Sequence, residues 1–363
     1  AQVTGYREET PDLGRLSCHI LMTSATRTMQ MDNLVGLDNF ISIPHQSYCY
    51  DFMSEWMHSD EAQDLYGLAR KTEDELRLPA RFSQLPVTEL VNTEFFPCID
   101  ECILKNFMAD IVNNTLDADA ALTVIDRRRT YLWYEHVENY YTGVVQAANM
   151  QKFYLDHSAG FHTVEPHKVW KEYISDYYHM DTYYRLFQNA FLNSLTSSNE
   201  QLDDLFKQVA DSIENLYVNW YLDNLGTNWA TAAKDNLKEY GRILEVPQQR
   251  DFYRSRVENA DTRVFVIISD AMRYEVAVTL ANELRQETQA KVTMESCEGI
   301  FPTVTKFGMA ALLPHKNLKA KLQANGTIGV LADGQPTDAG CRDGILKSAD
   351  PSSVTLQYKN IIK

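Results

Sequence analysis

The sequence predicts an α + α/β chain, in which a helical bundle region is followed by an α/β sheet domain. From about residue 100 to 250, apolar residues recur every three or four positions, which is typical of packed helices. At Val264 the period changes, and the continuous apolar run Val264–Ile268 leads directly into a helical pattern. A further apolar run of strand length is Ile328–Ala332. We therefore expect a mixed or helical region with a Pro-punctuated linker, a helical bundle and an α/β domain, over residues 1–99, 100–255 and 262–363.

Composition narrows the class of protein. The chain has 363 residues, 44% of them hydrophobic, and a net charge of −16. Such an acidic surface does not attract nucleic acid indiscriminately, although a local basic face still could. No stretch approaches the roughly 20 apolar residues of a membrane span, and the acidic start is unlike a secretory signal. We expect a cytoplasmic protein with no membrane partner.

The first 99 residues carry no reactive pattern. The pairs Leu78-Pro79, Leu85-Pro86 and Phe96-Pro97 break the segment into short pieces, as a linker or a junction between helical units would be. The first residue is not methionine, which suggests the inside of a longer protein. Cys98 and Cys102 lie four apart on an expected helix, and without a second ligand pair they are interpreted as structural.

Two apolar seams define the predicted bundle. Aromatic residues recur at spacings of three and four along one helix, and a second seam repeats the pattern: Trp170, Tyr173, Tyr177, Met180, Tyr184, Phe187 and Phe191, then Leu202, Leu205, Val209, Ile213, Leu216 and Trp220. A base-stacking platform would carry interleaved Lys and Arg, whereas the first seam is flanked by acidic residues. Core packing is therefore favoured. Arg127–Arg129 could contact phosphate, but such a run is more often a solvated face.

The α/β region is expected to alternate strands and helices. Val264–Ile268 is predicted as a parallel strand buried on both faces, and Lys291–Met294 as a second strand. Helices are expected over Ala271–Arg285, Lys306–Leu313 and residues 318–325, before a turn at Asn325-Gly326 and the strand Ile328–Ala332.

Two residues stand where this pattern changes. Asp270 follows the first expected strand, at the end where open α/β sheets gather ligand and catalytic groups. It could instead cap the next helix. Thr305 opens the helix Lys306–Leu313, where free N–H groups favour an anion, and it too could be a simple N-cap.

The segment SDAMRYE and, thirty-five positions after Asp270, Thr305 within FPTVTKFGMAALLPH resemble the PglZ family of the alkaline phosphatase superfamily. The resemblance extends weakly from Trp133 and strongly from Phe252, through VLADGQ and CRDGIL. It implies that Asp270 is a metal ligand and that Thr305 is both metal ligand and phosphate-accepting nucleophile. Thr303 is the nearest competitor for the nucleophile.

Three further residues have weaker roles in this interpretation. Arg273 and Lys306 could add positive charge near a phosphoryl group, although Arg273 could equally fix its loop through a salt bridge. Asp333 matches a family pattern, yet no metal role is expected for it, and it is interpreted as a turn residue.

The resemblance implies a metal-dependent phosphatase or phosphodiesterase with two divalent ions, zinc first and Mn²⁺ or Mg²⁺ as alternatives. It also implies a part in BREX phage defence beside a methyltransferase and an ATPase, with a phosphoester or nucleic acid as substrate. No further ligand cluster is found between Pro314 and Lys363, so we expect an incomplete domain that is inactive alone. The alternative is a catalytically weak or inactive scaffold that assembles the defence complex.

Other enzyme classes lack their signatures. A haloacid-dehalogenase-type phosphatase would have a second Asp where Met272 stands. There is no GxSxG elbow and no GxxxxGK loop, so serine-hydrolase and P-loop chemistry are not indicated.

Overall fold

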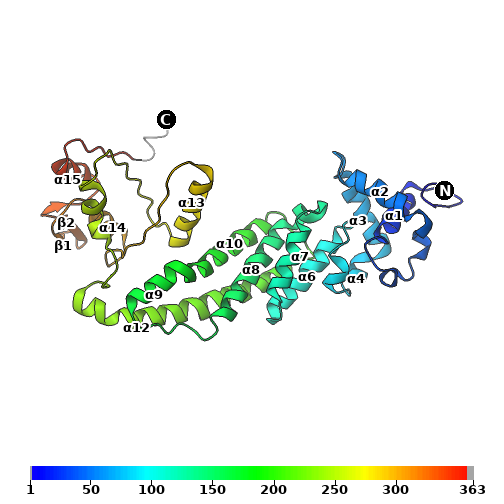
Figure 1. Cartoon of the computed structure of the whole chain (residues 1–363), viewed down its shortest axis with the longest axis horizontal. Helices are drawn as coiled ribbons and strands as arrows, with labels where there is room; N and C mark the ends of the chain where they lie inside the picture. The colour runs from blue at the N-terminus through cyan, green and yellow to red at the C-terminus, as the bar shows by residue number, and fades with distance from the viewer. Residues whose placement is uncertain (1, 358–363) are drawn as a thin grey trace. The chain divides into compact units, whose positions relative to one another are not determined.

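A computed structural model describes residues 2–357 and divides the chain into two compact units. Unit 1 contains the described residues up to Phe161 together with Met180–Leu225, and unit 2 contains His162–His179 and the described residues from Gly226. The predicted α + α/β class is confirmed, because helices dominate and a small sheet follows them late in the chain (Figure 1). The predicted boundaries at residues 99, 255 and 262 stay a prediction.

Unit 1 is entirely helical over its described residues. Its helices are α1 (Leu13–Ala25), α2 (Gln46–Met57), α3 (Asp64–Leu76), α4 (Leu78–Phe82), α5 (Val87–Leu90), α6 (Cys98–Asn113), α7 (Ala118–Arg128), α8 (Glu138–Asp156), most of α10 (Tyr178–Ser194) and α11 (Asp203–Asn215). Short 3₁₀ turns are η1 (Met31–Leu34), η2 (Asp38–Phe40), η3 (Ile43–His45) and η4 (Leu132–Val137), and η6 (Leu216–Leu222) is a π-helical turn. No helix among residues 2–357 is both long and apolar enough to cross a bilayer.

Helix α6 is the centre of unit 1, since it packs against α4, α8 and α11. Its apolar residues Ile99, Ile103, Leu104, Met108 and Ile111 are fully buried, which accounts for the helical period seen there. The second predicted seam is also buried along α11, at Val209 and Ile213. In the first seam, Met180 and Phe187 are buried, while the helix is interrupted by the π-helical turn η5 (Tyr173–Tyr177).

Helix α6 also buries charge. Asp100 accepts bonds from Arg128 Nε and Nη2, both at 2.7 Å, and from the Tyr141 hydroxyl at 2.7 Å. Arg128 is fully buried, so the prediction of a solvated Arg127–Arg129 run was wrong at its middle residue. The reason is that Arg128 occupies the inner face of α7, where a buried carboxylate compensates its charge.

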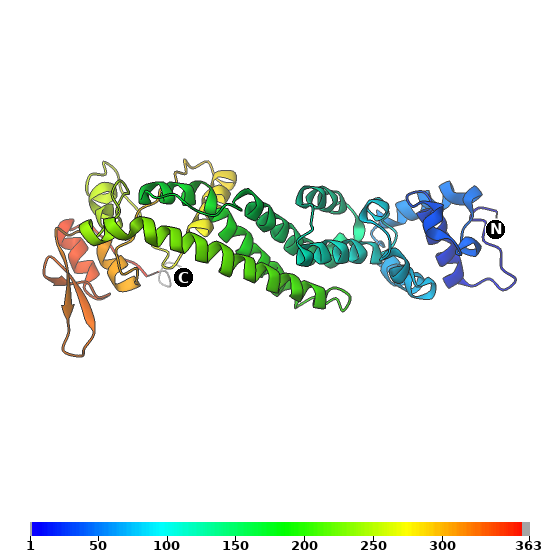
Figure 2. The same ribbon diagram turned by 90° about the horizontal axis from the view of Figure 1, so that it is seen from below.

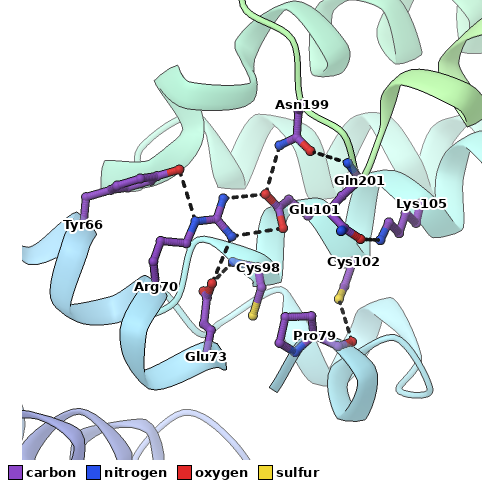
Figure 3. A network of polar contacts seen from close by, with 10 residues as sticks. All are labelled: Tyr66, Arg70, Glu73, Pro79, Cys98, Glu101, Cys102, Lys105, Asn199 and Gln201. Atoms are coloured by element: carbon purple, nitrogen blue, oxygen red, sulfur yellow. Dashed lines mark hydrogen bonds and ion pairs between the residues drawn. The ribbon is translucent and has the colours of Figure 1, made fainter. Parts of the chain in front are cut away.

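A second polar cluster joins α3, α6 and the segment before α11. Arg70 binds both Glu73 and Glu101, and the Asn199 amide donates to Glu101 at 2.9 Å (Figure 3). Glu73 in turn accepts the backbone N–H of Cys98 at 2.7 Å, at the first residue of α6. These contacts satisfy carboxylates that would otherwise be buried without partners.

Unit 2 contains the rest of the elements. They are α9 (Pro166–Glu172), η5, most of α12 (Asp223–Tyr240), η7 (Gln249–Asp251), η8 (Tyr253–Glu258), α13 (Tyr274–Glu287), α14 (Thr305–Ala311), β1 (Leu318–Leu322), β2 (Ile328–Ala332), β3 (Gln335–Pro336) and α15 (Arg342–Ala349). A small core forms from Ala233, Ile243 and Val246, against which Trp170 and Trp229 pack.

The sheet of unit 2 is antiparallel, with order β1-β2-β3 (Figure 2). The strand Ile328–Ala332 is confirmed, but its partner is β1, which was predicted as a helix. Leu, Ala and Lys all favour helices, yet Leu318, Ala320 and Leu322 alternate with lysines at period two. Pairing with β2 across the Asn325-Gly326 turn decides in favour of the strand.

The predicted parallel strands are not formed. Val264–Ile268 is extended but pairs with no strand, and its five residues are 40%, 78%, 46%, 94% and 48% exposed, in chain order. Lys291–Met294 is also unpaired. A doubly buried strand needs neighbours on both edges and helices on both faces, and the described residues supply none of these to Val264–Ile268.

Candidate functional site

Asp270 lies between the extended segment that ends at Ile268 and helix α13. The helix begins at Tyr274 with Arg273 as its N-cap, so Asp270 does not cap it. Ala271 has a left-handed backbone with φ of +59°, and its N–H donates to Asp270 Oδ1 at 3.0 Å. This sharp turn and its hydrogen bond fix the direction of the Asp270 carboxylate.

Thr305 is the first residue of α14, and Val304 is the N-cap. The Thr305 hydroxyl does not cap the helix but donates to Asp270 Oδ2 at 2.9 Å. The structure thus brings together the two residues that the resemblance singled out, 35 positions apart in the chain. Their catalytic and metal-binding roles remain predictions.

The pair lines a cavity of about 510 Å³, together with Gln249, Phe252 and Thr303. Asp270 and Thr305 are solvent-exposed, so a substrate can reach both oxygens. Thr303 shares the cavity, but only the hydroxyl of Thr305 is bonded to Asp270 among the described residues.

The other candidate residues lie elsewhere or are already engaged. Lys306 Nζ donates to the carbonyl of Ile328 at 2.8 Å, and so it supports β2. Arg273 Nε lies 3.3 Å from the buried carboxylate of Glu275, which supports the salt-bridge alternative for Arg273.

Asp333 accepts the backbone N–H groups of Lys316 and Asn317 at 2.9 and 2.8 Å. Those bonds lower the pKa of its carboxyl below the ordinary value, because they favour the charged form. With φ of +48°, Asp333 opens the turn between β2 and β3 and lines a different cavity from Asp270. Its interpretation as a turn residue fits these contacts.

The segment that carries Thr303 and Thr305 is tied to residues 243–249. Glu298 receives the backbone N–H of Ile243 at 3.0 Å and the side-chain amide of Gln248 at 3.3 Å. The Glu298 backbone bonds to Pro247 and Gln249 on either side, at 2.7 and 2.9 Å. Sequence reasoning missed Glu298 and Gln249, since neither belongs to a motif and both act through contacts about fifty residues apart.

The oxygens of Asp270 and Thr305 are the donor set that this cavity offers to a divalent cation. A carboxylate oxygen beside a hydroxyl oxygen suits a hard or borderline cation. Over residues 2–357, however, no group of three or more His, Cys, Asp or Glu residues lies together in a way that could hold a metal. Asp270 and Thr305 alone do not complete such a donor set, and their metal-binding role stays a prediction.

Comparison with known proteins identifies the class. Residues 252–363 match the family model described as the BREX system PglZ alkaline phosphatase-like domain. No solved structure matches the chain. The resemblance to PglZ proteins is thereby confirmed. Asp270 and Thr305 lie inside the matched residues, whereas Gln249, which lines the same cavity, lies just before them.

Two curated relatives extend this likeness over 98% of the chain. The alkaline phosphatase-like protein PglZ of Bacillus cereus (strain H3081.97) is 29% identical, and the alkaline phosphatase-like protein BrxZ of Escherichia coli O9:H4 (strain HS) is 31% identical. The chain spans 41% and 43% of their lengths. It is therefore similar to proteins named alkaline phosphatase-like in both of its units.

Proposed function

We propose that this chain forms part of a metal-dependent phosphatase or phosphodiesterase that acts in BREX phage defence. The observation that carries the proposal is the 2.9 Å bond between Thr305 Oγ1 and Asp270 Oδ2 at an open cavity of the PglZ-matched domain. In the proposed reaction, Thr305 Oγ1 attacks the phosphorus of the ester, the bond from phosphorus to the ester oxygen breaks, and the alcohol leaves with a proton. Water then hydrolyses the phosphothreonine and restores the Thr305 hydroxyl, which Asp270 orients.

A threonine hydroxyl is a weak nucleophile at neutral pH and needs activation. The bond to Asp270 selects one orientation of the hydroxyl and, because Thr305 is the donor, leaves both lone pairs of its oxygen free to face the cavity. Asp270 is itself oriented by the N–H of Ala271, so the two side chains form a preorganised pair.

Asp270 and Thr305 would also hold a divalent cation, with Zn²⁺ as first choice and Mn²⁺ or Mg²⁺ as alternatives. When bound, such an ion stabilises a threonine alkoxide and neutralises charge on the phosphoryl oxygens. We propose two ions, as the resemblance implies, with the remaining ligands supplied by groups other than the described residues.

The substrate class proposed is a phosphoester, including a nucleic acid. The proposed partners are a BREX methyltransferase and ATPase, and the proposed location is the cytoplasm, where phage DNA is encountered. The names of the relatives state only that they are alkaline phosphatase-like.

A second candidate function is a scaffold that assembles the defence complex with weak or no catalysis. The observation that favours it is that the described residues of unit 1 form a helical body.

The test compares Thr305→Ala with Thr303→Ala in the intact protein. We expect Thr305→Ala to lower hydrolysis of an aryl phosphodiester by several orders of magnitude, because the nucleophile is removed. Thr303→Ala removes a hydroxyl from the same cavity but not from Asp270, and it should cost on the order of tenfold or less.

Thermal melts of both variants check folding. If Thr303 is the essential residue, the nucleophile is misassigned. If neither substitution affects hydrolysis or phage resistance, the scaffold function is favoured over the enzyme.

A further inference from the structure

Gln249 is a polar side chain of the candidate cavity to which no role is yet assigned. It begins the 3₁₀ turn η7, which packs against α14, and it is half-buried. It lines the same cavity as Asp270 and Thr305.

The orientation of its amide follows from one contact. The backbone N–H of Ile300 donates to Gln249 Oε1 at 3.2 Å. A backbone N–H can bond only to an acceptor, so the oxygen must face Ile300, and the NH₂ group must point the other way. No acceptor bonds Nε2 among residues 2–357.

The side-chain amide of Gln249 lies beside Gly308 of α14. A Cβ built on Gly308 would be 3.6 Å from Gln249 Nε2 and 3.8 Å from Oε1, both ordinary contact distances. Gly308 is three residues after Thr305, so the two positions share a face of the helix. The Gln249 amide therefore lies beside the face of α14 that carries Thr305, and its nitrogen, turned away from the Ile300 N–H, is available to a ligand in the shared cavity.

We infer that Gln249 is a phosphoryl-binding residue, which donates Nε2–H to an oxygen of the phosphoryl group attacked by Thr305. The inference rests on the proposed function and adds a specific contact to it. Nearby donors of this kind stabilise the charge that develops on phosphoryl oxygens, and they need not move during the reaction when they are held in place. The Ile300 N–H holds this one.

The substitution Gln249→Glu tests the inference. Glutamate has the same shape and can still accept the Ile300 N–H through a carboxylate oxygen. It replaces the donor with a negative oxygen, which would repel a phosphoryl group. If Gln249 only ties the loop to η7, Gln249→Glu should lower kcat/KM by less than about tenfold, through the added charge in the cavity alone. If it binds the phosphoryl group, kcat/KM for an aryl phosphodiester should fall roughly 10²-fold.

The matched control is Gln335→Glu, which makes the same change of charge in unit 2. Gln335 is exposed and lines the separate cavity with Asp333. It should leave hydrolysis and melting temperature unchanged. The melting temperature of Gln249→Glu should also stay close to that of the parent protein.

Binding of inorganic phosphate to the intact protein, measured by calorimetry, separates this inference from the proposed reaction. If the parent protein binds phosphate without hydrolysing the diester, and Gln249→Glu weakens that binding at least tenfold, the inference holds while the enzymatic function fails. If hydrolysis and phosphate binding survive in Gln249→Glu at the parent level, the inference is overturned and the function stands. If the parent protein neither hydrolyses the diester nor binds phosphate, both are overturned.

Discussion

Ala271 shows at the scale of one residue how the site is held. Its φ of +59° lies in the left-handed region, which residues with a Cβ enter at a cost of about 1–2 kcal/mol. The conformation is retained next to Asp270, and strained backbone of this kind clusters at functional sites. The turn directs the Asp270 carboxylate towards Thr305.

The substitution Ala271→Val should destabilise the protein by on the order of 1 kcal/mol, because a β-branched side chain tolerates this backbone less well than alanine. Ala271 is exposed, so lost packing would not explain the effect. Chemical denaturation measures the change. Ala290→Val, at an exposed position with ordinary φ, is the control and should shift stability by less than about 0.5 kcal/mol. Equal shifts in both variants would show that Ala271 carries no strain.

Glu94 gives a prediction about pH. Burial raises the pKa of its carboxyl above the ordinary value, against the attraction of His58 and Arg128. A raised pKa in the folded state means that ionisation is easier after unfolding. Glu94 therefore costs no stability below its unfolded pKa of about 4.3, and it costs progressively more as pH rises through the folded pKa.

We expect Glu94→Gln to raise stability at pH 7 by a few tenths of a kcal/mol, discounted because the side chain is only half-buried. The difference should vanish near pH 4. Denaturation midpoints at both pH values measure it, with exposed Glu55→Gln as control. A gain at pH 4 as large as that at pH 7 would contradict the assignment to ionisation.

The residues of the site differ in whether the sequence alone could predict them. Asp270 and Thr305 were predicted through a resemblance, and the structure places their oxygens 2.9 Å apart. Gln249 could not be predicted, because its meaning depends on a bond to Ile300, 51 positions away. Lys306 Nζ donates to the Ile328 carbonyl of β2, a contact that its sequence position does not show, and its role near a phosphoryl group stays a prediction.

At the scale of elements, α6 depends on compensated charge as much as on apolar burial. Arg128, from the last turn of α7, is bound to Asp100 of α6 at two 2.7 Å bonds. Both side chains are fully buried. Removing one partner leaves the other as an unpaired charge in the interior.

Arg128→Ala should therefore lower the free energy of unfolding of unit 1 by about 3–5 kcal/mol. Arg127→Ala removes the neighbouring exposed arginine and should change it by less than about 0.5 kcal/mol. Urea denaturation followed by circular dichroism compares the two. Similar midpoints for both variants would mean that the Asp100 pair contributes little.

Elements with a strong, local period were predictable, and those set by partners far along the chain were not. The helical period that begins near residue 100 and is buried in α6, and the second seam along α11, follow from spacing alone. β1 was predicted as a helix because its composition favours one, and only its register with β2 settles the conformation. Val264–Ile268 was predicted as a strand because its apolar run resembles one. Its composition does not show whether other strands pair with its edges, and no described strand does.

At the scale of the whole molecule, the chain spans 41% and 43% of the lengths of its two relatives, and this bears on how many metal ligands it can offer. Protein metal sites of this kind commonly use three or four protein ligands. Asp270 and Thr305 offer two oxygens, and the described part of the chain brings no cluster of three His, Cys, Asp or Glu.

We predict that the 363-residue chain binds Zn²⁺ more weakly than the intact protein and shows little turnover. Elemental analysis and calorimetry on both proteins measure this, with Asp270→Asn in the intact protein as the reference for a damaged site. Equal metal content and robust hydrolysis by the 363-residue chain would show that the metal site has been misplaced.

The exposure of Val264–Ile268 has a practical consequence for handling the protein. Five consecutive apolar residues, four of them β-branched and none charged or proline, make a short window of high β-propensity. Their edges are unpaired in the extended conformation, so two copies could pair with each other and begin cross-β aggregation. Concentrated solutions of this chain should scatter light increasingly with time, and Arg263 at the start of the segment is the nearest charge that opposes such stacking.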